Sequence, residues 1–370
     1  MMDKKKADIS PKDTKVKRKS LWYRIFMIAA GIIIVALISV IAYIIHLMSL
    51  VNYDPGTAPP DNGVTEPEYF ATVENPEDYT DLPVASVESE HTGDGRSEPG
   101  IYNILLMGLD RDSGNLSDSM IVVTIDINDR SIKLTSFLRN ILLPIPGHST
   151  NQLNTVFRTG GFELVKEVFA KSFDLCIDGY VSVNYSEFTE VIDKLGGVNV
   201  YLTEEEVRYL NTTNYIADEK YRNLEVYTGV HWLNGAQATG YSRVRGIGKG
   251  NELYDFGRTS RQRAVLNALY EQLRSKSLPD LLSLMESVLP SVTTNLTIPE
   301  MTEIATKAVA AGVLSSEMEQ LRIPLDELHQ NAYYEKMLIL DIDFEANTKV
   351  VHEFIFGDTE DEDEPESSAG

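Results

Sequence analysis

The stretch NILLMGLDRDSGNLSDSMIVVTIDINDRSIKLTSFLRN, residues 103–140, decides the fold class of this 370-residue chain. Residues 102–107 form an apolar run of strand length that stops at Gly108. Residues 119–126 and 131–138 are rich in β-branched residues and are joined by INDR, so they predict a β-hairpin. A buried strand followed by a hairpin indicates that the folded body begins with a β-sheet.

Helical and extended patterns alternate after this stretch. Apolar residues at 162, 164, 165, 168 and 169 follow a helical stripe. Helices are also predicted over 186–197 (begun by Ser186), 233–245 (capped by Asn234), 258–273, 279–289 and 299–312, and strands over 178–183, 198–202, 318–322 and 336–341. Because strands and helices intermix, the predicted class is α/β (α+β) with a mixed sheet.

The N-terminal end differs in charge from the rest of the chain. The net charge is −23, yet residues 1–24 contain nine Lys or Arg and three Asp. Residues 25–45 contain no charged residue and would span roughly 30 Å as a helix, the thickness of a bilayer core. We expect a retained transmembrane anchor over 25–47 rather than a cleaved signal peptide, with the basic tail 1–24 in the cytoplasm and the body outside the cell.

The remaining boundaries follow from composition. Residues 48–100 read as an acidic, Pro-rich extracellular linker, and residues 357–370 as a disordered acidic tail. The core is expected over 101–275, and 276–356 as the C-terminal part of the same domain. An acidic body argues against nucleic acid as a partner, and the single Cys176 excludes an intramolecular disulfide.

Five arginines lie within residues 241–263 of this acidic chain: Arg243, Arg245, Arg258, Arg261 and Arg263. Arg258, Arg261 and Gln262 share a helix face at the predicted start of the helix 258–273, where cations are unfavourable unless an anion also lies there. Guanidinium groups bind phosphate with planar, bidentate geometry. Salt bridges with Glu252 and Asp255 are the alternative, but five arginines exceed those two acids, so an oxyanion site is favoured.

Two further stretches carry candidate site residues. Asp110 follows the first strand, and Asp118 precedes the next, so both carboxylates could face one end of the sheet and hold Mg²⁺ with a phosphate. From spacing alone, the interpretation of both as ordinary turn residues is favoured. Arg139 ends an apolar strand, where either an ion pair or a phosphate would satisfy it. A pyrophosphate fits all three stretches, and no nucleotide-binding or hydrolase motif is present.

Taken together, these motifs resemble the LytR–CpsA–Psr (LCP) family of Gram-positive bacteria. The resemblance covers about residues 101–275 and rests on NILLMGLD, SDSMIVVTID, LTSFLRN, LNTVFRTGG, YVSVNYSEFTEVIDKLGGVNV, LNGAQATGYSRVR and DFGRTSRQRAVL, in that order. It implies a mixed sheet sandwiched between helices, with an apolar pocket for a polyprenyl chain. It also implies a membrane-anchored phosphotransferase that moves a glycan phosphate (teichoic acid, capsule or a related polysaccharide) from undecaprenyl pyrophosphate to peptidoglycan.

The resemblance also assigns roles to residues. Asp110 and Asp118 match the family's Mg²⁺-linked aspartates (Mn²⁺ being an alternative), and Asp110, Asp118 and Arg139 form the expected catalytic set. The pyrophosphate would be bound by Arg139, Arg243, Arg245, Arg258 and Gln262. Arg111 and Arg261 are additional candidates for the site.

Three positions depart from the family pattern: Leu116, Asn140 and Gln152 stand where the family commonly has Arg, Asp and Lys. Apolar pocket candidates are Val156, Phe157, Phe162, Val165, Val168, Phe169, Phe188 and Ile192, although plain core is the expectation for each. Two other functions stay open: a non-catalytic polyprenyl-phosphate-binding or envelope regulatory protein, and a polyprenyl pyrophosphatase.

Overall fold

The computed structural model describes residues 39, 41–59, 80–81, 91–110, 114–248 and 254–357. The chain divides into two units, Met1–His46 and Leu47–Gly370, and the sheets and helices below belong to the second. Among the described residues, no helix is long and apolar enough to cross a membrane. The predicted basic tail, most of the predicted anchor and the acidic tail beyond residue 357 lie outside them.

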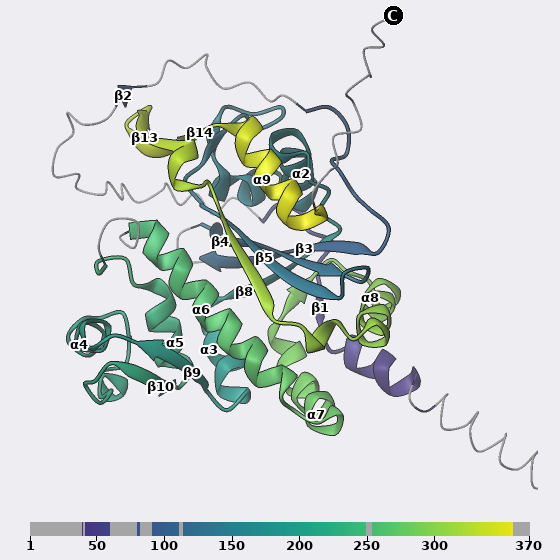
Figure 1. Ribbon diagram of the computed structural model, residues 1–370, viewed down its shortest axis with the longest axis vertical. Coiled ribbons are helices and arrows are strands. Elements are labelled where there is room, and N and C mark those ends of the chain that lie inside the picture. Colours follow the sequence, from purple (N-terminus) through teal and green to yellow (C-terminus); the bar gives the residue numbers. More distant parts are fainter. Residues whose placement is uncertain are drawn as a thin grey trace, which may run out of the picture. The chain divides into compact units, whose positions relative to one another are not determined.

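A seven-stranded sheet forms the centre of the second unit (Figure 1). In spatial order its strands are β1 (Asn52–Tyr53), β11 (Thr293–Thr294), β8 (Gly179–Asn184), β3 (Ile101–Asp110), β4 (Leu116–Asp126), β5 (Ser131–Phe137) and β12 (Met318–Ile323). β3 pairs antiparallel with β4 and parallel with β8, whereas β5 pairs antiparallel with β4 and parallel with β12. The predicted mixed sheet and the predicted hairpin are therefore confirmed.

Smaller sheets lie beside this one. β9 (Val198–Leu202) and β10 (Gly229–Leu233) form an antiparallel ribbon. The others combine β14 (Met337–Ile342), β13 (His329–Tyr334) and β2 (Thr80–Asp81), and β6 (Leu142–Leu143) with β7 (Asn151–Gln152). The ribbon keeps the alternation expected for a half-buried sheet, because Val198, Val200 and Leu202 are buried while the residues between them are exposed.

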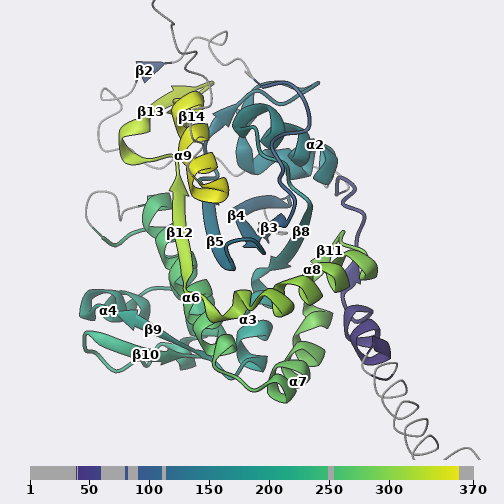
Figure 2. The ribbon, with the colours of Figure 1, turned by 45° about the vertical axis from the view of Figure 1, so that its right-hand side comes forward.

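Helices cover both faces of the central sheet (Figures 1 and 2). α2 (Val156–Phe173) and α9 (Phe344–Phe356) lie on one face, and α6 (Tyr254–Arg274) and α8 (Ile298–Ala311) on the other. The ribbon packs with α3 (Tyr185–Lys194), α4 (Glu204–Thr212), α5 (Gly235–Arg243) and α6, and α7 (Leu278–Val288) contacts α3. Short 3₁₀ turns span Leu153–Thr155, Glu219–Tyr221, Leu289–Ser291, Val313–Ser315 and Asp326–Leu328.

Every residue of β5 is buried because both of its faces are covered. Phe137 packs edge-on against Phe169 and Phe173 of α2, with ring centroids 4.9 and 4.8 Å apart. Ile132 packs on the opposite face with Tyr270 of α6. The apolar pocket candidates lie in the core as well: six pack in the cluster beneath α2, while Ile192 and the partly buried Phe188 belong to the cluster around the ribbon.

Several boundaries differ from the sequence expectation. α3 begins at Tyr185, because the side chain of Asn184 rather than Ser186 accepts the backbone N–H of Glu187. α6 begins at Tyr254, which places Arg258 in its second turn, beyond the strongest part of the helix dipole. Asn52–Tyr53 pair with β11, so this part of the predicted linker belongs to the sheet. β13 and α9 were not predicted.

Candidate functional site

Asp118 occupies a β-bulge between β3 and β4. Gly108 pairs with Ser119 and Leu109 pairs with Ser117, so Asp118 is the extra residue that has no partner in β3. Bulges bend the strand locally and redirect a side chain, which is one reason they occur beside functional sites. A Cβ at Gly108 would lie 3.1 Å from the Cβ of Ser119, so a glycine suits this close approach. The bulge therefore sets the direction of the Asp118 carboxylate.

Three arginines from separate elements converge on one oxygen of Asp118. Nη1 of Arg139, which follows β5, lies 2.8 Å from Asp118 Oδ1. Arg258 Nη1 of α6 and Arg245 Nη2, from the segment after α5, lie 3.5 and 3.8 Å from the same oxygen. The structure thus brings together three of the predicted pyrophosphate-binding residues and one predicted catalytic aspartate.

Asp255 in the first turn of α6 is the second acid of this cluster. Its Oδ2 accepts a hydrogen bond from Arg139 Nε at 3.0 Å. Its Oδ1 lies 3.1 Å from Arg258 Nη2 and 3.3 Å from Arg245 Nε. The alternative of a local salt bridge is therefore partly realised, although Glu252 lies outside the described residues. Three guanidinium groups and these two carboxylates leave one positive charge in excess.

Tyr185, at the start of α3, completes the contacts of Asp118. Its hydroxyl donates to Asp118 Oδ2 at 2.5 Å, and the guanidinium carbon of Arg243 lies 4.3 Å from its ring centroid. Burial, and then the negative charge of Asp118, raise the pKa of the Tyr185 hydroxyl, so it remains a donor. Asp110 at the end of β3 also acts electrostatically on this hydroxyl. Sequence reasoning missed Tyr185, although its position directly after a strand adjacent to β3 could have indicated it.

Burial strengthens the electrostatic interactions within this cluster. The Arg258 side chain is 4% exposed, and its Nε is buried without a hydrogen-bond acceptor among the described residues. Burial disfavours the charged form of Arg139, but Asp255 and Asp118 outweigh it and raise the pKa of Arg139 above its ordinary value. A buried N–H group without an acceptor is costly. The cluster therefore offers a fixed cation and a free donor to an incoming anion.

Arg261, Gln262 and Arg111 are the remaining candidates for the pyrophosphate site. Arg261 Nε donates to Glu206 Oε1 at 3.0 Å, and its Nη2 donates to the carbonyl of Ile247 at 3.0 Å, so it ties the segment after α5 to α6. Gln262 lies one turn beyond Arg258 on α6 and is half-buried. Arg111 lies outside the described residues. The structure therefore does not bring Arg261 to the Asp118 cluster.

Asp110 and Asp118 are the two carboxylates predicted to hold Mg²⁺. Among the residues that the structure describes, no group of three or more His, Cys, Asp or Glu side chains could hold a metal. Asp110 is the last residue of β3, Asp118 is the bulged residue near the start of the adjacent β4, and both act electrostatically on Tyr185. A carboxylate has about four lone-pair sites, so Asp118 keeps acceptor capacity beyond its contacts. The pair fits Mg²⁺ if a bound phosphate and water supply the other oxygens.

The fold and this site define a mixed α/β protein with an arginine–aspartate cluster at one end of its sheet. The profile of the LytR_cpsA_psr family matches residues 72–349. The chain belongs to this family, as the sequence motifs predicted.

Sequence similarity to individual proteins agrees with this family membership. The chain is 30% identical over 244 residues to the polyisoprenyl-teichoic acid–peptidoglycan teichoic acid transferase TagV of Bacillus subtilis, a match that spans 63% of this chain and 60% of that relative. It is also 30% identical over 176 residues to the regulatory protein MsrR of Staphylococcus aureus, covering 47% of this chain and 50% of MsrR.

Solved structures agree on the fold. The crystal structure of B. subtilis TagV superposes with a TM-score of 0.54 at 25% identity, covering 71% of this chain and 100% of that one. A structure titled "TagT bound to LI-WTA" gives a TM-score of 0.55 at 20% identity, covering 74% and 99% of the two chains. The central mixed sheet flanked by helices is therefore the architecture of this family.

Proposed function

We propose that this protein transfers a glycan phosphate from a polyprenyl-pyrophosphate-linked polymer to peptidoglycan. The polymer class is a teichoic acid or a related polysaccharide, in keeping with the name of the TagV relative. In the reaction, a sugar hydroxyl oxygen of peptidoglycan attacks the polymer-side phosphorus. The bond to the lipid-side phosphate breaks, and polyprenyl phosphate leaves.

One observation carries this proposal: Arg139, Arg245 and Arg258 converge with an excess of positive charge, and Arg258 Nε has no acceptor in the part of the chain that the structure describes. A pyrophosphate has closely spaced negative charges that planar guanidinium groups bind in bidentate fashion. The same groups would stabilise the charge that develops on the leaving phosphate. Asp118 and Asp255 hold the three side chains in position before substrate binds.

The carboxylates have further roles in this proposal. Asp110 or Asp118 accepts the proton of the attacking hydroxyl, and Tyr185 keeps the Asp118 carboxylate oriented through its 2.5 Å hydrogen bond. Asp110 and Asp118 would also hold Mg²⁺ or Mn²⁺, which when bound neutralises phosphate charge. Arg243 lies against Tyr185 and extends the positive surface beyond the three central arginines.

The location proposed for the reaction follows from the N-terminal sequence. The uncharged stretch 25–45 would anchor the chain in the cell membrane, and the basic residues before it would remain in the cytoplasm. The body would then act outside the cell, where a lipid-linked pyrophosphate and peptidoglycan are both within reach of a tethered enzyme.

The test is transfer by the purified protein from a polyprenyl-pyrophosphate glycan to peptidoglycan oligomers, with covalent product followed by mass spectrometry. We expect Arg258→Ala and Asp118→Ala to abolish the phosphodiester product while the circular dichroism spectrum is kept. Glu206→Gln is the matched control, because it removes the acid partner of Arg261 outside the cluster. Unchanged transfer in both site variants would contradict the proposal.

A non-catalytic envelope function is the second candidate, and the departures from the family pattern favour it. Asn140 stands where the family commonly has Asp, and its Oδ1 is buried with no hydrogen-bond partner among the residues that the structure describes. Gln152, in place of Lys, donates its amide to the carbonyl of Leu338 at 3.0 Å. Under this alternative, the arginine cluster would bind polyprenyl pyrophosphate without product. Lipid binding without metal-dependent transfer would therefore favour it.

A further inference from the structure

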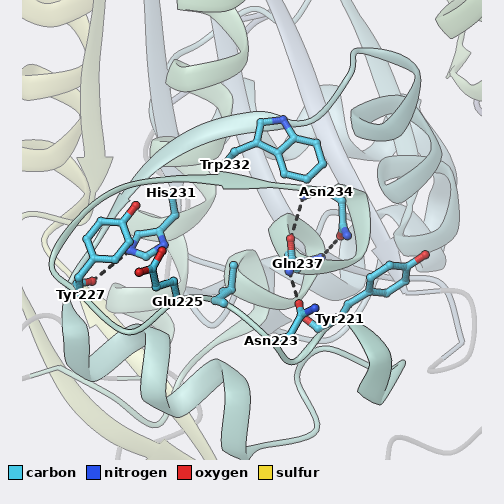
Figure 3. Close-up of a pocket in the computed structure, with 9 residues that line it drawn as sticks. Tyr221, Asn223, Glu225, Tyr227, His231, Trp232, Asn234 and Gln237 are labelled. Atoms are coloured by element: carbon cyan, nitrogen blue, oxygen red, sulfur yellow. Dashed lines mark hydrogen bonds between the residues drawn. The ribbon is translucent and has the colours of Figure 1, made fainter.

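A hollow lies beside the ribbon of β9 and β10, away from the arginine cluster (Figure 3). It encloses about 370 Å³ between β10, the loop before it and the start of α5. Figure 3 shows Tyr227, His231 and Glu225 on one side, Trp232 above, and Asn223, Tyr221 and Gln237 on the other. Of the described residues that line this hollow, none is a lysine or an arginine, which argues against a phosphate ligand.

Two aromatic rings at this hollow are both exposed and rigidly held. Trp232 is 57% exposed, yet its Nε1 donates to the carbonyl of Gly196 at 3.0 Å. Tyr227 is 41% exposed, and its ring stacks on His231 with centroids 4.1 Å apart while its hydroxyl donates to the carbonyl of Val230 at 2.8 Å. Rings fixed in this way bind a ligand face without losing further conformational freedom.

The polar groups at the hollow fall into two kinds. Gln237 and Asn234 are used by the protein, because they form the capping box of α5 and Gln237 Nε2 donates to the carbonyl of Tyr221 at 2.9 Å. Asn223 and Glu225 are exposed. Among the described residues, neither side chain forms a hydrogen bond or ion pair. One amide and one carboxylate beside two fixed rings can bind paired hydroxyl groups while the rings cover an apolar face.

We infer that this hollow binds a neutral sugar chain as a secondary glycan subsite. A sugar ring has the required combination of an apolar C–H face and adjacent hydroxyl groups, whereas the Glu225 carboxylate and the acidic chain disfavour an anionic ligand. α5 connects the two sites: Gln237 lies at the hollow and Arg243 at the arginine cluster, about 9 Å apart along the helix axis. The inference rests on the proposed function, since it supplies a holding site for one of the two glycan substrates.

The binding experiment uses the two tryptophans of the chain, Trp22 and Trp232. Full-length protein carrying Trp22→Phe leaves Trp232 as the only tryptophan, and its fluorescence is titrated with the hexamer of N-acetylglucosamine. We expect a saturable change, and binding about tenfold weaker in the double variant Asn223→Ala, Glu225→Ala. Both positions are exposed, so this variant should fold normally.

The matched control is Tyr201→Ala, since Tyr201 is an exposed aromatic of the same ribbon, 62% exposed, that does not line this hollow. The inference is overturned if no saturable change occurs up to roughly millimolar hexamer, or if Tyr201→Ala weakens binding as much as the double variant. Peptide-free peptidoglycan strands and the isolated glycopolymer are then titrated in parallel arms. Binding of either one supports the subsite and identifies its source.

Transfer assays separate this inference from the proposed function. If both hold, the Asn223/Glu225 variant raises the KM for the glycan that binds and keeps kcat, while Arg258→Ala loses transfer and keeps hexamer binding. Hexamer binding without any transfer by the unmodified protein would overturn only the proposed function. Normal transfer with an unchanged KM in the double variant would overturn only the subsite.

Discussion

Replacing Asp255 with Asn tests whether the arginine cluster is an anion site or a structural ion network. The change keeps the size of the side chain but removes one of two carboxylates that face Arg139, Arg245 and Arg258 at 3.0, 3.3 and 3.1 Å. The excess positive charge rises from one to two. Both interpretations predict lower stability, but only the anion site predicts tighter binding of an anion.

The magnitudes follow from the contacts. Breaking a buried ion pair costs about 3–5 kcal/mol, and the 15% exposure of Asp255 favours the lower end of that range. An anion on the same guanidinium groups would face Asp255 across roughly 6 Å, where Coulomb's law at a dielectric constant of about 20 gives about 3 kcal/mol of repulsion. Salt screening reduces this to about 1.4 kcal/mol, so pyrophosphate should bind about tenfold more tightly to the variant.

The assay is calorimetric titration of purified protein with inorganic pyrophosphate, together with unfolding in urea. Glu206→Gln serves as the control, because the Glu206–Arg261 pair is comparably buried at 3.0 Å but lies outside the cluster. That control should lower the unfolding free energy and leave pyrophosphate binding unchanged. Pyrophosphate binding to Asp255→Asn that is unchanged or weaker would refute the anion-site reasoning.

Three further substitutions have expected outcomes. Tyr185→Phe removes the hydroxyl that donates to Asp118, so it should lower the unfolding free energy by about 1.5–3 kcal/mol in urea denaturation and should also slow transfer. An unchanged unfolding free energy and an unchanged transfer rate would contradict the positioning role of Tyr185. Burial lowers the pKa of His352 in the folded protein, so the unfolded chain takes up a proton at a higher pH than the folded protein does. The free energy of unfolding should therefore fall as the pH drops below 6.5, and His352→Gln should reduce this fall in thermal melts between pH 7 and pH 5. Burial and then Arg322 lower the pKa of Arg263 to about 10, and its Nη1 is buried without a hydrogen-bond partner within the described ranges. Arg263→Met should therefore leave the unfolding free energy unchanged or raise it by about 1 kcal/mol, whereas a loss of several kcal/mol would show an unrecognised partner.

Local patterns in the sequence predicted the fold class of this protein and several of its elements, although β13 and α9 were missed. The run 102–107, the hairpin around INDR and the helical stripe of α2 are local patterns, and each appears in the structure at nearly the expected residues. Asn234 caps α5 as predicted, because a capping box depends only on residues three apart. The excess of arginine over nearby acid within residues 241–263 was also readable and predicted Arg245 and Arg258 as site residues, whereas Arg139 was a candidate because it ends an apolar strand.

Only the tertiary structure decided which charges meet. Arg139 and Asp255 are separated by 116 residues and Tyr185 and Asp118 by 67, so no local pattern could join them. The bulge at Asp118 arises from the register of two strands, and register depends on how whole strands pair rather than on neighbouring residues. Arg261 illustrates the same limit: its spacing of three residues placed it with Arg258, but Glu206 of α4 lies beside α6 in the fold and accepts its Nε–H at 3.0 Å. The sequence therefore specified a surplus of cations, whereas packing of the helices on the sheet decided which of them form the site.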